Sequence, residues 1–76
     1  MSIEEKKKIA DEANMIVGGY SFTYKGKDVE VVNLNMQNPH TMIMTRDGKA
    51  VESNMDPIEE AIVLEKWDKN KSFMEV

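Results

Sequence analysis

The sequence predicts a small α+β domain: a two-layer α-β-β-β-β-α arrangement in which a four-stranded antiparallel meander packs against an N-terminal and a C-terminal helix. Three observations predict it. Both ends carry a helix-capping pattern followed by periodic apolar residues, the middle is rich in β-branched and aromatic residues, and two similar segments in that middle are centred on glycine. With 76 residues, the chain has room for one domain, residues 1–76, with a modest core.

The N-terminal helix is predicted from its first residues. Ser2 followed three positions later by Glu5 is a capping-box pattern, which predicts a helix that begins at Ile3. Apolar residues then recur every three or four positions, as an amphipathic helix over about residues 3–17 requires; they are Ile9, Ala10, Ala13, Ile16 and Val17. We expect Gly18-Gly19 to end this helix, because glycine readily adopts the left-handed C-cap conformation.

Two look-alike segments follow. Residues 23–30 and 45–52 share the pattern T-x-x-G-K-x-V-E, 22 positions apart. A glycine between runs of β-forming residues predicts a chain reversal, so we expect hairpins over residues 20–34 and 41–53 with tips at Gly26 and Gly48. The predicted strands are 20–24, 27–34, 41–45 and 49–53. The connector between the hairpins contains Pro39, which lacks a backbone N–H and predicts a loop.

The turn type at Gly48 has two solutions from sequence. Either Asp47-Gly48 forms a two-residue type I′ loop, or Arg46-Asp47 forms a type I turn with Gly48 as a bulge. The two solutions differ by one residue in strand register. The bulged form places Ile43 opposite Val51 and is favoured for that reason, although the choice stays open.

The C-terminal helix has the clearest start in the chain. Asp56 is a capping residue, Pro57 suits the first helical position, and Glu59 lies three residues after the cap. The helix is predicted over about residues 57–69, with an apolar side that covers the sheet and consists of Ile58, Ala61, Ile62, Leu64 and Trp67. Residues 70–76 could form a short strand or a frayed tail.

Composition narrows the range of partners. Ten basic and fourteen acidic residues give a net charge of −4, which opposes attraction to nucleic acid and anionic lipid. Cysteine is absent and no apolar run is long enough to span a bilayer, so we expect a cytoplasmic protein without a membrane partner. Acidic residues concentrate in the predicted second helix, where they form a solvated face or, alternatively, a docking site for a basic protein surface.

Nothing in the sequence predicts catalysis. His40 is the only histidine, and the serines and glycines lack the spacing of a nucleophile elbow or a phosphate loop. His40, Met42 and Met44 alternate on one predicted strand and could form a soft metal site, but alternating methionines more often fill a core. We therefore expect no metal, no cofactor and no catalytic residue, with a small hydrolase or other enzyme as the weakest alternative.

A non-catalytic protein-interaction or regulatory domain is the leading functional hypothesis, with self-association as a homodimer as one form of it. Seven methionines in a short chain suggest an adaptable contact surface. The alternative is a nucleic-acid contact through the basic hairpin tips, although Asp28 and Asp47 lie in the same tips. The candidate interaction residues are Met36, His40, Met42 and Met44 on or beside the sheet, and Lys25, Lys27, Arg46 and Lys49 at the tips.

Overall fold

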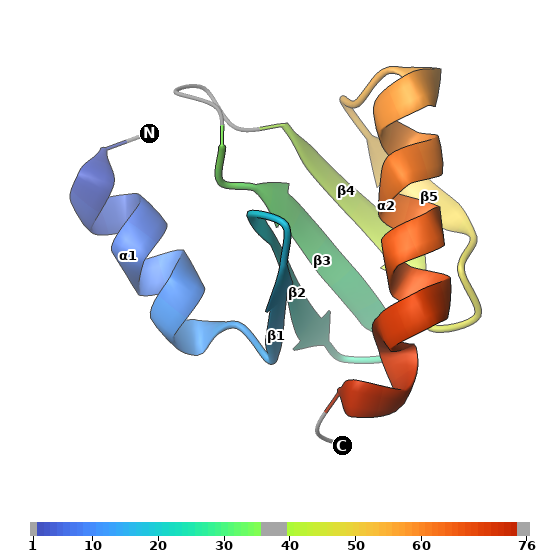
Figure 1. Cartoon of the computed structure of the whole chain (residues 1–76), viewed down its shortest axis with the longest axis horizontal. Helices are drawn as coiled ribbons and strands as arrows, with labels where there is room; N and C mark the ends of the chain where they lie inside the picture. The colour runs from blue at the N-terminus through green and yellow to red at the C-terminus, as the bar shows by residue number, and fades with distance from the viewer. Residues whose placement is uncertain (1, 36–39, 75–76) are drawn as a thin grey trace.

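A computed structural model describes residues 2–35 and 40–74 and shows an antiparallel meander flanked by two helices (Figure 1). In chain order the elements are α1 (Ile3–Glu12), β1 (Met15–Val17), β2 (Tyr20–Lys25), β3 (Asp28–Asn33), β4 (Thr41–Thr45), β5 (Ala50–Ser53), α2 (Pro57–Asn70) and the short 3₁₀ helix η1 (Lys71–Phe73). The strands lie side by side in the order β1-β2-β3-β4-β5. The predicted α+β meander is confirmed, with five strands where four were expected.

The additional strand comes from residues assigned to the first helix. The capping box at Ser2 is present, but α1 ends at Glu12 and residues 15–17 pair with β2. Gly18 and Gly19 have φ of 58° and 83° and form the two-residue loop of the β1–β2 hairpin, which fits a type I′ turn. The expected helix end at these glycines is wrong, because β-branched residues next to a Gly-Gly pair gain a ladder partner in β2.

Both look-alike segments form hairpin tips, as predicted, but their loops differ. Lys25 pairs with Asp28, which leaves Gly26-Lys27 as a two-residue loop. The positive φ of 62° is confined to Gly26, which fits a type II′ turn.

The tip at Gly48 has the bulged form that the sequence favoured. The Gly48 N–H donates to the Thr45 carbonyl at 3.0 Å, as in a type I turn, and the Thr45 N–H donates to the Lys49 carbonyl at 2.8 Å. The expected pairing of Ile43 with Val51 is wrong. A second irregularity in the ladder skips Val51, so that Ile43 lies opposite Glu52.

One face of the sheet is buried under α2. Asp56 caps this helix through its carboxylate, which accepts the Glu59 N–H at 2.8 Å. The core combines side chains from the sheet with Val63 and Trp67 of α2; the sheet residues are Tyr20, Phe22, Val29, Val31, Met42 and Met44. The rings of Phe22 and Trp67 stack at 5.9 Å, and the Trp67 indole N–H donates to the Arg46 carbonyl at 2.9 Å. The indole therefore fixes α2 to the β4–β5 hairpin.

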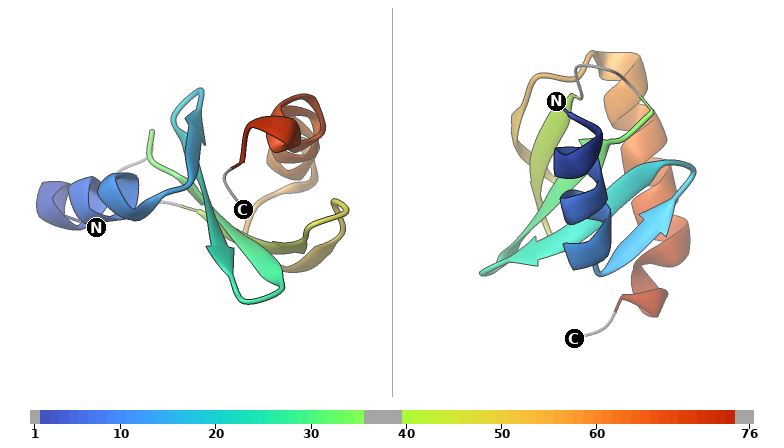
Figure 2. Two further views of the ribbon diagram at one scale, coloured as in Figure 1. Left: turned by 90° about the horizontal axis from the view of Figure 1, so that it is seen from below. Right: turned by 90° about the vertical axis from the view of Figure 1, so that its left-hand side faces the viewer.

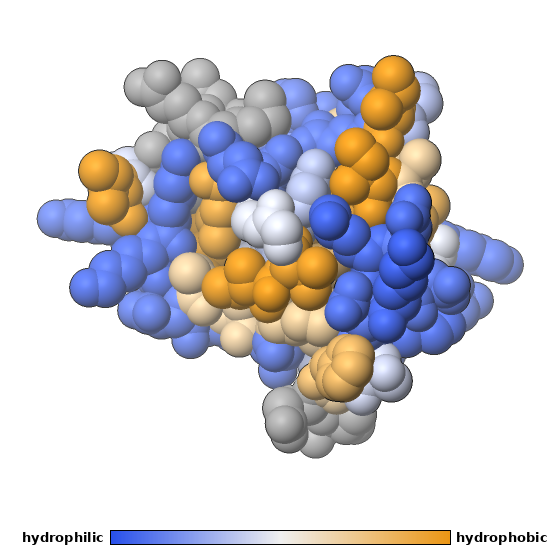
Figure 3. Space-filling model, in the orientation of Figure 1, coloured by the Kyte–Doolittle hydropathy of each residue, from blue (hydrophilic) through white to orange (hydrophobic). Residues whose placement is uncertain are grey.

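The predicted apolar side of α2 is only partly correct. Leu64 and Trp67 face the core, whereas Ile58, Ala61 and Ile62 are exposed. Figure 3 shows hydrophobic side chains at the surface of α2 and over β1 between the two helices.

At the C-terminus, residues 71–73 form η1 and Met74 enters the core, so residues 70–74 are neither a strand nor a frayed tail. In the described part of the chain, no helix is long and apolar enough to cross a membrane.

The two helices lie on opposite sides of the sheet (Figure 2). The sequence predicted two layers, and the position of α1 on the side of the sheet opposite to α2 adds a third. Side chains from α2, Met55 and Met74 complete the core face, and α1 contributes no buried residue at all. On the α1 side of the sheet, Ser21 and Val32 are buried, whereas Thr41, Ile43 and Thr45 are only partly buried.

The Gly18-Gly19 loop provides a test of the five-stranded sheet. A Cβ at Gly19 would lie 2.3 Å from the Asn35 side-chain oxygen, whereas a Cβ at Gly26 would meet nothing within 4 Å. Both positions have positive φ, which costs a non-glycine residue about 1–2 kcal/mol. Gly19→Ala must also displace Asn35, whose amide donates to the Gly18 carbonyl.

We therefore expect Gly19→Ala to lower the free energy of unfolding by about 1 kcal/mol more than Gly26→Ala, the approximate value of that hydrogen bond. Urea unfolding followed by circular dichroism measures both variants. Equal losses would contradict the packing of Asn35 against Gly19.

Candidate functional site

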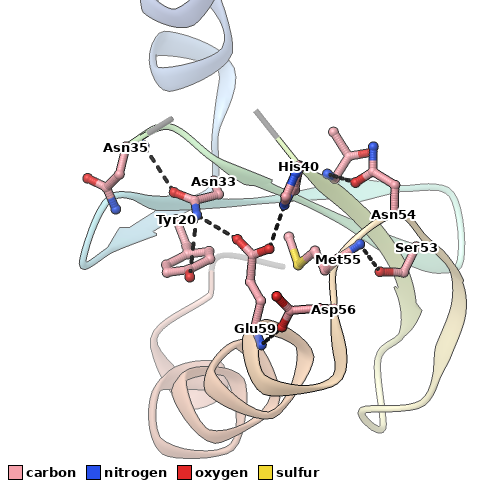
Figure 4. Close-up of polar contacts among 10 residues, drawn as sticks. Tyr20, Asn33, Asn35, His40, Ser53, Asn54, Met55, Asp56 and Glu59 are labelled. Atoms are coloured by element: carbon pink, nitrogen blue, oxygen red, sulfur yellow. Dashed lines mark hydrogen bonds and ion pairs between the residues drawn. The ribbon is translucent and has the colours of Figure 1, made fainter. Parts of the chain in front are cut away.

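The most concentrated polar chemistry in the described chain surrounds the carboxylate of Glu59 (Figure 4). One carboxylate oxygen lies 2.7 Å from His40 Nδ1, and the other accepts a hydrogen bond from the Asn33 amide at 2.6 Å. The Asn33 amide nitrogen is also 3.5 Å from the Tyr20 hydroxyl oxygen. Glu59 and Asn33 are buried, with exposed fractions of 9% and 6%. We name these four residues the Glu59 cluster.

Local structure positions each member of the Glu59 cluster. Glu59 lies in the first turn of α2, where its N–H is held by the Asp56 cap. Asn33 ends β3, and its side-chain oxygen accepts the Asn35 N–H at 3.0 Å. The Asn33 N–H donates to the His40 carbonyl at 3.0 Å, which brings His40 beside it just before β4. The Glu59 cluster therefore ties the start of α2 to the adjoining ends of β3 and β4.

The electrostatics of the Glu59 cluster act on Tyr20. Burial raises the pKa of the Tyr20 hydroxyl above its ordinary value of 10.0, and the negative charges of Glu59 and Asp56 raise it further. The neutral hydroxyl is therefore the form that the fold favours.

The arrangement has the parts of a proton-transfer pair, because a carboxylate on one imidazole nitrogen orients the ring. The Glu59 oxygens, however, are already occupied by His40 and Asn33. No three His, Asp or Glu side chains gather closely enough to hold a metal ion in residues 2–35 and 40–74. The geometry is that of a buried hydrogen-bonded anchor for α2.

Sequence reasoning missed the Glu59 cluster. Glu59 was grouped with a solvated acidic face, and nothing local separates it from its exposed neighbours. The partners of Glu59 lie 26 and 19 residues away in the chain, so only the packed structure identifies it. The sequence signal that bears on Glu59 is the Asp56-Pro57 helix start. It places Glu59 in the first turn of α2, next to the cap.

The predicted interaction surface around the methionines requires correction. Met42 and Met44 are both 0% exposed and fill the core under α2, as the alternative core interpretation expected. His40 is partly exposed but is bonded to Glu59. Met36 lies outside the described residues. Neither Met42 nor Met44 can therefore contribute to a contact surface in this fold.

The hairpin tips meet at one end of the sheet, as the meander predicted. The Arg46 guanidinium lies 4.0 Å from the centre of the Tyr24 ring, and its Nη2 donates to the Gly26 carbonyl at 2.9 Å. Arg46 therefore links the two tips to each other. The remaining predicted tip residues, Lys25, Lys27 and Lys49, are exposed.

The side of the sheet that carries α1 has a second distinctive surface. Cross-strand pairing aligns Glu30, Ile43 and Glu52 across β3, β4 and β5. Beside them is a hollow of about 370 Å³, lined by Thr41, Ile43, Glu52, Ser53 and Asn54. We name this surface, consisting of Glu30 and the hollow, the open face. It combines a hydrophobic centre with two carboxylates that form no ion pair within the described residues.

The anchoring role of Glu59 predicts a stability effect. Glu59→Ala removes the acceptor of two hydrogen bonds and leaves the buried Asn33 amide without its close partner, so we expect a loss of about 2–3 kcal/mol in the free energy of unfolding. Glu60→Ala, the adjacent control, should cost about 0.5 kcal/mol or less. Chemical denaturation measures both, and similar losses in the two variants would contradict the anchor.

The raised pKa of Tyr20 predicts a pH dependence in alkali. Below pH 10 the hydroxyl is neutral in both the folded and the unfolded chain. As the pH rises past 10, the unfolded chain loses this proton first, so the free energy of unfolding falls. Tyr20→Phe should make this decline shallower in urea titrations between about pH 9 and pH 11. An unchanged slope would show that Tyr20 does not titrate differently in the two states.

Comparison with known proteins gives a family without an assigned activity. No curated protein and no solved structure matches the chain. Residues 3–74, which include both helices and all five strands, match a family of unknown function, DUF7723. The chain therefore belongs to the DUF7723 family.

Proposed function

We propose that this protein is a non-catalytic protein-interaction domain and that the open face is its docking surface. The observation that carries the proposal is the unequal cover of the two sheet faces. On the α2 side, five sheet residues are completely buried: Phe22, Val29, Val31, Met42 and Met44. On the other side, α1 has no buried residue, and Ile43 remains partly exposed beside a hollow.

The chemistry of the open face supports a protein partner. Protein interfaces combine an apolar centre with a polar rim. Ile43 supplies the centre, Glu30 and Glu52 lie on either side of it across the strands, and Thr41 and Asn54 add hydrogen-bonding groups. Met42 and Met44 hold β4 on the core directly beneath Ile43, and β5 is paired with β4. A partner would therefore meet a preformed surface, which lowers the entropic cost of binding.

The other candidate surfaces have weaker support. At the hairpin tips, Arg46 is already engaged by Tyr24 and the Gly26 carbonyl, which reduces its capacity to bind a phosphate. On the acidic helix, Glu59 is buried in the Glu59 cluster and Glu65 pairs with Lys69 at 2.9 Å. Each alternative therefore loses part of the charge on which it depends, while Lys25, Lys27 and Lys49 at the tips and Glu60 on α2 form no ion pair within the described residues.

The proposal predicts the effect of a charge in the centre of the open face. Ile43→Lys should fold, because the new ammonium lies between Glu30 and Glu52, but it should remove the apolar contact. In an extract of the host, the tagged chain is expected to elute as a complex larger than its own 8.7 kDa, and Ile43→Lys should shift it to the size of the free chain.

Ile58→Lys is the matched control, since it places the same charge on an exposed isoleucine of α2. It should leave the complex intact. A complex that survives Ile43→Lys, or that is lost only with Ile58→Lys, would refute the open face as the docking surface.

A further inference from the structure

We propose that the occupant of the open face is a second copy of this chain, related by a two-fold axis so that α1 of each copy lies on the open face of the other. The inference rests on the proposed function and names its partner. Three features on the α1 side of the molecule support it. They are the exposed Ile3, the hollow beside Ile43, and the opposite charges of Lys7 and of Glu30 and Glu52.

The projecting residue is Ile3. It lies in the first turn of α1 and is 85% exposed, although a large aliphatic side chain gains about 1.5–3 kcal/mol from burial. The half-buried residues of α1 are Lys6, Ile9 and Ala10, with Ala13 just after the helix, and these mark the side that faces the sheet. Ile3 therefore projects from α1 without a hydrophobic partner within the described chain.

The hollow is the receiving feature. It lies at the start of β4 and the end of β5, and its hydrophobic member is Ile43. Thr41 and Ile43 alternate with Met42 and Met44, which face α2, so the hollow is on the side of the sheet that carries α1. Two such domains that turn their α1 sides toward each other can seat Ile3 of each copy in the hollow of the other. One two-fold axis satisfies both contacts at once, as an isologous interface requires.

Charge complementarity supports the same pairing. Lys7 is one helical turn after Ile3 on α1, so the two residues are surface neighbours. Lys7 is exposed, and it forms no ion pair within the described residues. Glu30 and Glu52 border Ile43 and likewise lack a cation there. Lys7 beside Ile3 thus matches the acidic border of Ile43, with Glu4 and Glu5 elsewhere in the first turn of α1, and each copy supplies both halves of the pairing.

The size of the required interface is compatible with one face of the domain. A standard interface buries about 800 Å² on each partner. The accessible surface of the chain is 4918 Å², so about a sixth of it would be covered. The molecule measures 30 × 27 × 21 Å, and the proposed interface would occupy one side of it, formed by α1 and the sheet face that carries α1.

The test is the mass of the purified chain in solution, measured by sedimentation equilibrium at low salt. We expect twice the chain mass of 8.7 kDa. Lys7→Glu and Glu52→Lys should each weaken the dimer at least tenfold, because each places like charges opposite one another. The double variant Lys7→Glu with Glu52→Lys should restore the dissociation constant to within about threefold, because the attraction is re-formed with its sign reversed.

Lys27→Glu is the matched control. It makes the same charge change at a hairpin tip, at the opposite end of β4 and β5 from the hollow, and should leave the dissociation constant unchanged. Circular dichroism and urea unfolding establish that each variant is folded, so that a lost dimer reports on the interface. Ile3→Ser, which leaves every charge in place, should also weaken the dimer.

Four results would overturn the inference. A purified wild-type chain that stays monomeric would exclude the second copy; if Ile43→Lys still abolished the complex in host extract, the open face would remain the docking surface for a different protein. A dimer that persists in both single charge reversals, or a double variant that does not recover, would refute the pairing of Lys7 with Glu52. A dimer lost with Ile58→Ser and Ile62→Ser but not with the charge reversals would place the contact on α2.

Discussion

The burial of one sheet face under α2 is the constraint on which the rest of the structure depends. Five side chains from β2, β3 and β4 are completely excluded from water, and each contributes about 1.5–3 kcal/mol relative to exposure. Phe22 and Trp67 lie at the centre of this contact. Because a chain of 76 residues can build only one core, this face takes most of the buried apolar side chains and leaves α1, which has no buried residue, with a secondary role.

The Glu59 cluster determines how α2 lies on that face. A buried carboxylate is costly unless it is hydrogen-bonded, and Glu59 meets this requirement by contacting two residues at the ends of neighbouring strands. Hydrophobic burial alone is non-directional and would allow α2 to slide or rotate. The Asn33 and His40 contacts at one end of α2 and the Trp67 indole contact with Arg46 at the other restrict both movements. Polar contacts thus supply the position of the helix, and apolar contacts supply most of the stability.

The second sheet face has a different character because α1 is short and shallowly packed. α1 packs against β2, while β4 and β5 lie farther from it (Figure 2). Charged residues and threonines on the uncovered strands keep this face compatible with water, and Ile43 and Val51 are the large hydrophobic residues on β4 and β5 that retain exposed surface. A partly exposed hydrophobic side chain beside a hollow is a feature that a binding partner can use. The proposed interaction therefore follows from the way in which a small core is distributed, and no unusual side-chain chemistry is needed.

The sequence by itself determined the features that depend on a few neighbouring residues: the caps at Ser2 and Asp56, the reversals at Gly26 and Gly48, and the α+β meander that they delimit. Backbone hydrogen bonds within one turn and the φ preference of glycine act locally, so they can be recognised without the fold. Only the tertiary structure decided that residues 15–17 leave the first helix, because a spacing that suits a helix also suits an edge strand once β2 offers a ladder. Tertiary packing likewise buried Glu59 and both core methionines and left Ile3 and Ile43 in contact with water. The burial of Glu59 depends on residues 26 and 19 positions away, whose proximity no local pattern encodes, whereas β1 depends on residues three to seven positions away across the Gly18-Gly19 turn.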